Sequence, residues 1–230
     1  MYICVYIPTA IKHNKKGSKT MPKIVAVINS KGGTGKTTTV TNIAYHLHQA
    51  GESVLLVDID PQGSSAAWAA QNDHGVTVIQ LGEQINRDLP KFTAGYDWVF
   101  IDCPPQMAKL AGKAIRAADV ALIPTTPSPY DVWACEDMVD LVKAKMEATS
   151  DKFKAAFVIT MNIKNTNLSN EIQEALDEFE LPAFKSRITR SVIFPELTKD
   201  GVGVSSLSKK HPQATEIRQI VEELKELASV

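Results

Sequence analysis

A short run of glycines, lysines and threonines carries the clearest chemical signal in this chain. Residues 31–37 read K-G-G-T-G-K-T and follow an apolar run over residues 24–28. Glycine has no Cβ and readily adopts positive φ, which lets backbone N–H groups converge on one anion. A helix expected over residues 38–49 would add free N–H groups and the positive end of its dipole. The strand, loop and helix together predict a phosphate-binding loop.

The side chains of this loop suit a nucleoside triphosphate and a magnesium ion. Lys36 can reach the β- and γ-phosphates, and the Thr37 hydroxyl is a suitable Mg²⁺ ligand. The general pattern G-x-x-x-x-G-K-[ST] has glycine where this chain has Ser30, so the first glycine is replaced. A glycine-rich turn without a ligand is the alternative. The residues expected to contact nucleotide here are Lys31, Gly32, Gly33, Thr34, Gly35, Lys36, Thr37 and Thr38.

Lys31 is a second lysine with no evident partner in its own loop. One lysine already neutralises the phosphates, and another beside it adds repulsion when no nucleotide is bound. The pattern x-K-G-G-x-G-K-[ST] resembles the deviant Walker A box of the ParA/MinD family of ATPases. The resemblance implies that Lys31 crosses a dimer interface to the nucleotide of the facing subunit, where it acts with Lys36 in catalysis. A solvated surface lysine is the alternative.

Two acids follow the apolar run over residues 54–57, in the sequence D-I-D-P-Q. Alternation places Asp58 and Asp60 on one side at the carboxyl end of a strand, where open α/β sheets bind ligands. The segment resembles the family motif D-x-D-P-Q. The resemblance implies that Asp60 orients the attacking water and that Asp58 lies near the magnesium shell. Helix-capping or turn-forming acids are the alternative.

A further acid, Asp102, closes the apolar strand expected within residues 96–102 and fits a Walker B strand. It would hold magnesium, usually through a water, because Mg²⁺ keeps much of its hydration. No histidine is placed as a general base, but phosphoryl transfer depends mainly on positioning and charge stabilisation. We therefore expect slow, Mg²⁺-dependent hydrolysis of ATP.

Apolar strands and amphipathic helices alternate along the rest of the chain. Strands are expected over residues 120–124 and 155–161, and helices over 107–116, 131–148 and 170–179. This alternation predicts an α/β fold with a mostly parallel twisted sheet and helices on both faces, here a P-loop NTPase fold. A chain of 230 residues with 44% hydrophobic and 22% charged residues fits one soluble domain.

Residues 1–20 differ in composition, because they carry four lysines and no acid. Their apolar stretch, residues 2–7, is too short to span a membrane, and the basic residues follow it. We expect a disordered arm or an upstream start, with the ATPase domain over residues 21–230; a nucleic-acid-binding arm is the alternative. Cys4, Cys103 and Cys135 lack C-x-x-C spacing, which argues against zinc, a disulfide framework or a shared cluster and favours the cytoplasm.

Two segments near the expected site are less specific. Residues 124–131 read P-T-T-P-S-P-Y-D, and their prolines predict an extended loop that cannot join a sheet. The loop resembles the proline-rich turn of small ParF-type partition ATPases, where the following segment helps to form the dimer surface; a rigid connector is the plain interpretation. Asn162 ends a strand at the same edge and by family resemblance is a candidate for adenine recognition, with a turn asparagine as the alternative.

The stretch over residues 183–212 holds six basic residues against two acids, within a chain of formal net charge −1. Such a segment suits sequence-independent, salt-sensitive contact with DNA phosphates. A solvated charged surface is the alternative. The candidate DNA-binding residues are Lys185, Arg187, Arg190, Lys199, Lys209 and Lys210. The final helix, over residues 213–227, has a mainly acidic polar face, which argues against membrane binding.

The resemblance covers residues 21–230 and implies a ParA-type, ParF-like ATPase. We expect a homodimer on ATP binding, non-specific DNA binding on the nucleoid, and a ParB-like or other adaptor that stimulates hydrolysis. The role would be partition of plasmid or chromosome DNA. The alternative is a positioning ATPase for a protein compartment or other non-DNA cargo, since the cargo is chosen by the partner.

Overall fold

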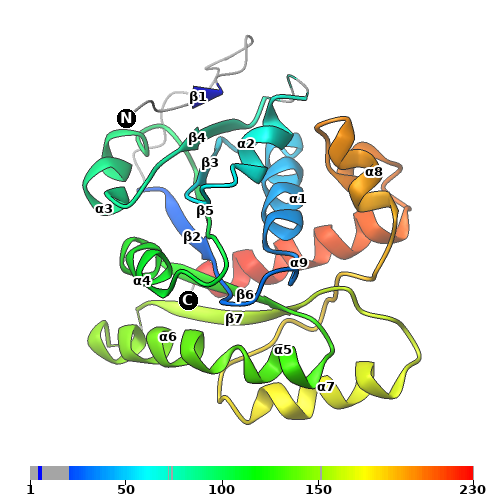
Figure 1. Cartoon of the computed structure of the whole chain (residues 1–230). Coiled ribbons are helices and arrows are strands. Elements are labelled where there is room, and N and C mark those ends of the chain that lie inside the picture. Colours follow the sequence, from blue (N-terminus) through cyan, green and yellow to red (C-terminus); the bar gives the residue numbers. More distant parts are fainter. Residues whose placement is uncertain (1–4, 7–20, 72, 74, 151, 230) are drawn as a thin grey trace.

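The computed structural model describes residues 5–6, 21–71, 73, 75–150 and 152–229. Within these residues a seven-stranded sheet has the order β1-β4-β3-β5-β2-β6-β7 (Figure 1). The strands from β4 to β7 in this order are all parallel, which confirms the expected α/β fold. They are β2 (Lys23–Val27), β3 (Val54–Asp58), β4 (Thr77–Gln80), β5 (Trp98–Asp102), β6 (Val120–Thr125) and β7 (Lys154–Ile159).

A short strand, β1 (Val5–Tyr6), lies at one edge of the sheet. It pairs antiparallel with β4, with Val5 opposite Ile79 and Tyr6 opposite Val78. These two residues belong to the basic N-terminal segment. Its other residues, 1–4 and 7–20, lie outside the described residues, and so does the expectation of a disordered arm.

Helices cover both faces because each strand sends alternate side chains to opposite sides. Val25 and Val27 of β2 enter one core, and Ala26 enters the other. The first core packs α1 (Lys36–Gln49), α2 (Ser64–Ala69), α8 (Ile193–Lys199) and α9 (Pro212–Ser229). The second packs α3 (Ile85–Asp88), α4 (Ala108–Ala117), α5 (Pro129–Trp133), α6 (Glu136–Ala148) and α7 (Asn167–Asp177).

Some elements differ from those expected. The strand β4 and the helices α2, α3 and α8 are additional, and α8 lies within the basic stretch. The helix expected over residues 131–148 is two helices, α5 and α6, separated at Ala134 and Cys135. The extended loop expected over residues 124–131 is wrong at both ends, because Pro124 and Thr125 belong to β6 and pair with β7. Helix α5 begins at Pro129, because the fixed φ of proline suits the first turn of a helix.

The final helix, α9, packs onto the domain through a buried apolar stripe that includes Ile217, Ile220 and Leu224. No helix among the described residues combines the length and the apolar character needed to cross a membrane. Because the main strands are parallel, their carboxyl ends meet at one edge of the sheet. The loops that leave this edge form the site described next.

Candidate functional site

The loop between β2 and α1 has the backbone shape of an anion-binding turn. Gly33 and Gly35 have φ of 80° and 82°, in the left-handed region that favours glycine. Gly35 is the N-cap of α1, so the unpaired N–H groups of the first helical turn adjoin the loop. Thr160, just after β7, donates its hydroxyl to the Thr34 carbonyl oxygen at 2.8 Å. The predicted strand, loop and helix are therefore present.

Lys36, the first residue of α1, is a buried cation at this loop, with 7% of its surface exposed. Its Nζ donates to the Lys31 carbonyl oxygen at 2.9 Å. Burial lowers the pKa of Lys36, and negative charge nearby, chiefly that of Asp102, partly opposes the shift. An anion held in the loop would favour the charged ammonium and offset part of the desolvation penalty.

Asp102 ends β5 beside the threonine of the loop. Its Oδ2 accepts hydrogen bonds from Thr37 Oγ1 at 2.9 Å and from Ser65 Oγ at 2.7 Å. Its Oδ1 is buried and has no hydrogen-bond partner among the described residues. Burial, with a smaller effect of the Asp58 charge, raises the pKa of Asp102 to about 7. A cation beside Oδ1 would therefore stabilise the ionised carboxylate.

Asp58 and Asp60 lie together after β3 but make different contacts. The two oxygens of buried Asp58 accept the backbone N–H groups of Asp60 and Ala66, each at 3.0 Å. Burial raises the pKa of Asp58. Asp60 is half-buried, and its Oδ1 accepts the N–H of Gln62 at 2.9 Å. Asp58 therefore holds the turn towards α2, and Asp60 is the more accessible carboxylate.

The donors at this edge fit a magnesium ion. Mg²⁺ prefers oxygen ligands, keeps several waters and uses one or two protein carboxylates with substrate phosphates. Thr37 and Asp102 are hydrogen-bonded neighbours, and Asp102 Oδ1 is a buried acceptor without a partner. In the described part of the chain, no cluster of three or more His, Cys, Asp or Glu could cage a metal. Thr37, Asp102 and Asp58 stay our predicted metal ligands.

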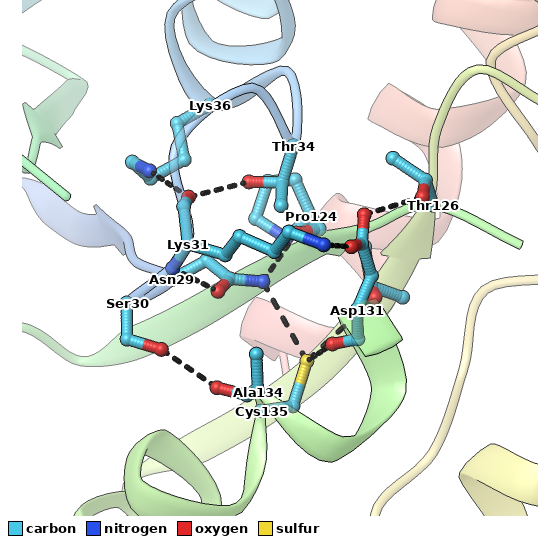
Figure 2. Close-up of polar contacts among 11 residues, drawn as sticks. Asn29, Ser30, Lys31, Thr34, Lys36, Pro124, Thr126, Asp131, Ala134 and Cys135 are labelled. Carbon is cyan, nitrogen blue, oxygen red and sulfur yellow. Dashed lines mark hydrogen bonds and ion pairs between the residues drawn. The ribbon is translucent and has the colours of Figure 1, made fainter. Parts of the chain in front are cut away.

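Lys31 makes an ion pair that the sequence analysis missed. Figure 2 shows its Nζ directed at Oδ1 of Asp131 in α5, and the other oxygen of Asp131 accepts from Thr126 Oγ1. The side chains of Lys31 and Asp131 are 40% and 8% exposed. The two residues are 100 positions apart, and the pairing of β2 with β6 brings them together. In this form Lys31 neutralises a carboxylate of its own chain.

Hydrogen bonds also connect the start of the phosphate loop to the end of β6 and the end of α5 (Figure 2). Asn29 Nδ2 donates to the Pro124 carbonyl oxygen at 2.8 Å, and its Oδ1 accepts the Lys31 N–H at 2.9 Å. Ser30 Oγ donates to the Ala134 carbonyl oxygen at 2.6 Å. Ser30, which stands where the general pattern has glycine, therefore connects the phosphate loop to the end of α5.

A cavity of about 450 Å³ lies beside the first turn of α1. The phosphate loop forms one side, and residues that follow β7, residues that precede α8 and the first turn of α8 form the others. A mostly apolar cavity with a few polar groups next to a phosphate loop suits a nucleotide base. The lining includes Gly35, Thr38, Met161, Thr189, Arg190 and Phe194.

Asn162 does not line this cavity. Its side chain is buried, and its Oδ1 accepts a hydrogen bond from Ser169 Oγ at 2.8 Å. Its backbone carbonyl oxygen accepts from Arg190 N and its N–H donates to Ile188 O, both at 2.9 Å. Because Ile188 and Arg190 line the cavity, Asn162 holds the cavity wall in place from behind. The contact of Asn162 with adenine stays a prediction.

The six basic residues of the 183–212 stretch differ in their surroundings. Arg187 is half-buried, and its guanidinium donates to the Ser169 carbonyl oxygen and hydroxyl. Arg190 is exposed but lines the cavity beside α1. The remaining four are exposed and are the freer candidates for contact with nucleic acid: Lys185, Lys199, Lys209 and Lys210.

The parallel sheet, the phosphate loop and the acids at its carboxyl edge define a P-loop nucleotide-binding domain. A family model described as the CobQ/CobB/MinD/ParA nucleotide binding domain matches residues 25–204. The chain belongs to this family, which confirms the resemblance to ParA/MinD proteins.

The chain is also similar to individual proteins of known sequence and, in its fold, to solved structures. It is 31% identical to the maintenance of carboxysome distribution protein A of Halothiobacillus neapolitanus, covering 87% of this chain and 95% of that protein. It is 26% identical to the chromosome partitioning protein ParA of Myxococcus xanthus, covering 84% of each. The solved cobyrinic acid a,c-diamide synthase of Mycobacterium smegmatis, with bound ATP analog and magnesium, has a TM-score of 0.71, 23% identity and coverage of 89% and 94%.

Proposed function

We propose that this chain is a magnesium-dependent ATPase whose ATP-bound form is a homodimer. The observation that carries the proposal is the pair of lysines in one phosphate loop, of which Lys36 is buried within the loop and Lys31 is held outside it by Asp131. The adjacent cavity supplies space for a base, and Thr37 with Asp102 supplies oxygen ligands. The likeness to a structure with bound ATP analog and magnesium supports the choice of ligand.

In phosphoryl transfer, some of these residues would position the phosphates and the attacking water, and others would stabilise the negative charge of the phosphates. Lys36 and the N–H groups of the loop hold the β- and γ-phosphates, and Asp60 orients water towards the γ-phosphate. Magnesium, when bound near Thr37 and Asp102, neutralises charge on the phosphate oxygens. No covalent intermediate on the protein is needed, so Cys103 and Cys135, both buried with their pKa raised by burial, have no role as nucleophiles.

Lys31 would link ATP binding to dimer formation. In the single chain Lys31 forms an ion pair with Asp131, so only one lysine of the loop, Lys36, would contact a nucleotide bound there. When two loops face each other over two triphosphates, each Lys31 can exchange the carboxylate for phosphate oxygens of the opposite chain. The exchange needs the charge of the triphosphate, and hydrolysis therefore weakens the dimer.

We propose a positioning role for this switch, with a protein compartment as the favoured cargo. The favouring observation is the 31% identity, over nearly the whole length, to a carboxysome distribution protein. DNA partition is the second candidate, because the chromosome partitioning ParA is also similar across most of its length. In both cases an adaptor on the cargo would stimulate ATP hydrolysis, and the ATP-bound dimer would bind non-specific DNA as the surface along which the cargo moves.

Two lysine variants test the ATPase proposal. Lys36→Ala should abolish nucleotide binding, because the buried cation that holds the phosphates is lost. Lys31→Ala should still bind ATP but should neither dimerise nor turn it over. Titration with a fluorescent ATP analogue and light scattering measure the two steps separately. ATP-dependent dimers of Lys31→Ala would show that Lys31 has no role between subunits.

Binding to DNA is tested separately, with and without a third variant. We expect binding to a non-specific duplex with ATP, but not with ADP or without nucleotide, and weaker binding at the higher of two salt concentrations. Lys209→Ala with Lys210→Ala should lower the affinity and the salt dependence together. DNA binding that is the same in all nucleotide states would contradict the switch.

A further inference from the structure

A second cavity lies at the opposite end of β2 from the phosphate loop. It has a volume of about 570 Å³, compared with about 450 Å³ for the cavity beside α1. Its walls come from the start of β2, from α3 with the short helix η1 (Leu89–Lys91) that follows it, and from the C-terminal end of α4. Figure 1 shows α3 and α4 on one side of the sheet, next to the start of β2. A volume of this size is typical of small-molecule sites.

The inner wall of this cavity is apolar. Leu89 is 2% exposed and belongs to the core beneath α4, and Ile24 packs against the same core. Pro90 and Ala117 continue the apolar lining, and Met21, which is 89% exposed, lies at the mouth. A bound molecule would therefore need an apolar body to gain from burial here.

Two cations, Lys23 and Arg116, also line this cavity. Both are exposed, and neither makes an ion pair within the described part of the chain. The negative charge of the lining comes from Asp119, whose Oδ2 accepts the Ile24 N–H at 2.9 Å. Burial lowers the pKa of Lys145, and the nearby charge of Asp119 partly opposes this shift. Asp119 is therefore shared with groups outside the cavity, which leaves an excess of positive charge inside it.

We propose that this cavity binds a small molecule that has an apolar body and one anionic group, a carboxylate or a phosphate. The apolar body would cover Leu89 and Ile24, and the anionic group would contact Arg116 and Lys23. The planar guanidinium of arginine can donate two parallel hydrogen bonds to either anion, so the chemistry of the two groups is shared.

Other occupants fit the cavity less well. The phosphates of nucleic acid could meet the two cations, but a duplex would leave the apolar wall uncovered. Residues 7–20 precede Met21 in the sequence, but they carry four lysines and no acid, so Lys23 and Arg116 would repel them. The proposal does not rest on the ATPase function, because the cavity and the phosphate loop lie at opposite ends of β2.

Binding is tested on the full chain with anilinonaphthalene sulfonate, a fluorescent dye that joins an apolar body to one anionic group. We expect saturable binding, and octanoate or octyl phosphate should displace the dye, which also distinguishes a carboxylate from a phosphate ligand. Octylamine, which has the same chain with a positive charge, should not displace it. ATP with magnesium should leave the dye bound, and displacement by ATP would place the dye beside α1 and overturn the proposal. So would displacement by a peptide with the sequence of residues 7–20.

Protein variants locate the site. Lys23→Gln with Arg116→Gln should weaken dye binding about tenfold or more, because the charged hydrogen bonds are lost. Ala117→Phe adds a ring to the cavity wall without removing core volume, and it should weaken binding to a similar extent. The matched control, Arg87→Gln with Lys109→Gln, removes two exposed cations of α3 and α4 that do not line the cavity. This control should change the affinity by less than about twofold, and equal losses in both double variants would overturn the proposal.

Discussion

Replacing Asp131 with asparagine should make the ATP-dependent dimer form more readily. In the single chain Asp131 competes with the phosphates of a facing subunit for Lys31. Asp131→Asn keeps the size of the side chain and an oxygen that can still accept from Thr126. It removes only the negative charge that holds the lysine.

The size of the effect follows from the exposure of the two partners. A hydrogen bond to a charged group contributes about 1.5–3 kcal/mol when buried. Asp131 is 8% exposed but Lys31 is 40% exposed, so solvent screening reduces the contribution to about 1 kcal/mol. A dimer releases two such pairs, and the gain of about 2 kcal/mol corresponds to a dimer Kd about 30-fold lower.

Light scattering or analytical ultracentrifugation over a range of protein concentrations, with ATP and magnesium, measures this Kd. Asp140→Asn is the matched control, because Asp140 is an exposed aspartate in α6. An unchanged or raised Kd for Asp131→Asn would refute the idea that Asp131 restrains Lys31.

Three further outcomes are expected. Asp60→Ala should accumulate ATP-bound dimers without phosphate release, and a monomeric variant with full activity would remove Asp60 from the mechanism. Glu216 accepts hydrogen bonds from the N–H and the hydroxyl of Thr189, at 3.0 and 2.6 Å, and Thr189 lines the cavity beside α1. Glu216→Ala should therefore weaken ATP binding about tenfold but leave the binding of tripolyphosphate, which has no base, unchanged. Equal losses for both ligands would contradict a base-positioning role. Burial, aided by the Lys225 charge, lowers the pKa of His46. The contribution of neutral His46 to the free energy of unfolding is therefore full above about pH 6.5 and is lost as the pH falls towards the folded-state pKa. In urea unfolding experiments, the stability of His46→Gln should depend less on pH over this range, and a pH profile identical to that of the unchanged protein would exclude the effect.

The elements that carry the phosphate site could be predicted from the sequence because their signals are local. The strand β5 ends at Asp102 as expected, and β3 ends at Asp58, since apolar runs closed by an acid mark the carboxyl ends of buried parallel strands. The start of α1 follows from the glycines before it. These features depend on neighbouring residues and not on distant contacts.

Other features depend on which strands are neighbours, which no local pattern shows. The proline-rich loop marked the segment that contains Asp131, but its contact with Lys31 requires β6 to pair with β2. Ser65 reaches Asp102 from a helix too short to show a clear period. Counting charges over residues 183–212 could not show that Arg187 turns inward to Ser169.

The central claim is that Lys31 serves the nucleotide of the opposite subunit, and mixing two inactive variants tests it most directly. Lys31→Ala keeps Asp60 but lacks the donated lysine, and Asp60→Ala keeps Lys31 but cannot orient water. If Lys31 acts across the interface, a mixed dimer contains one complete site, so ATP hydrolysis should appear only in the mixture. Lys31→Ala mixed with the Lys31→Ala, Asp60→Ala double variant should stay inactive. If Lys31 acts within its own subunit, both sites of the mixed dimer are defective, and a mixture as inactive as its components would contradict the account.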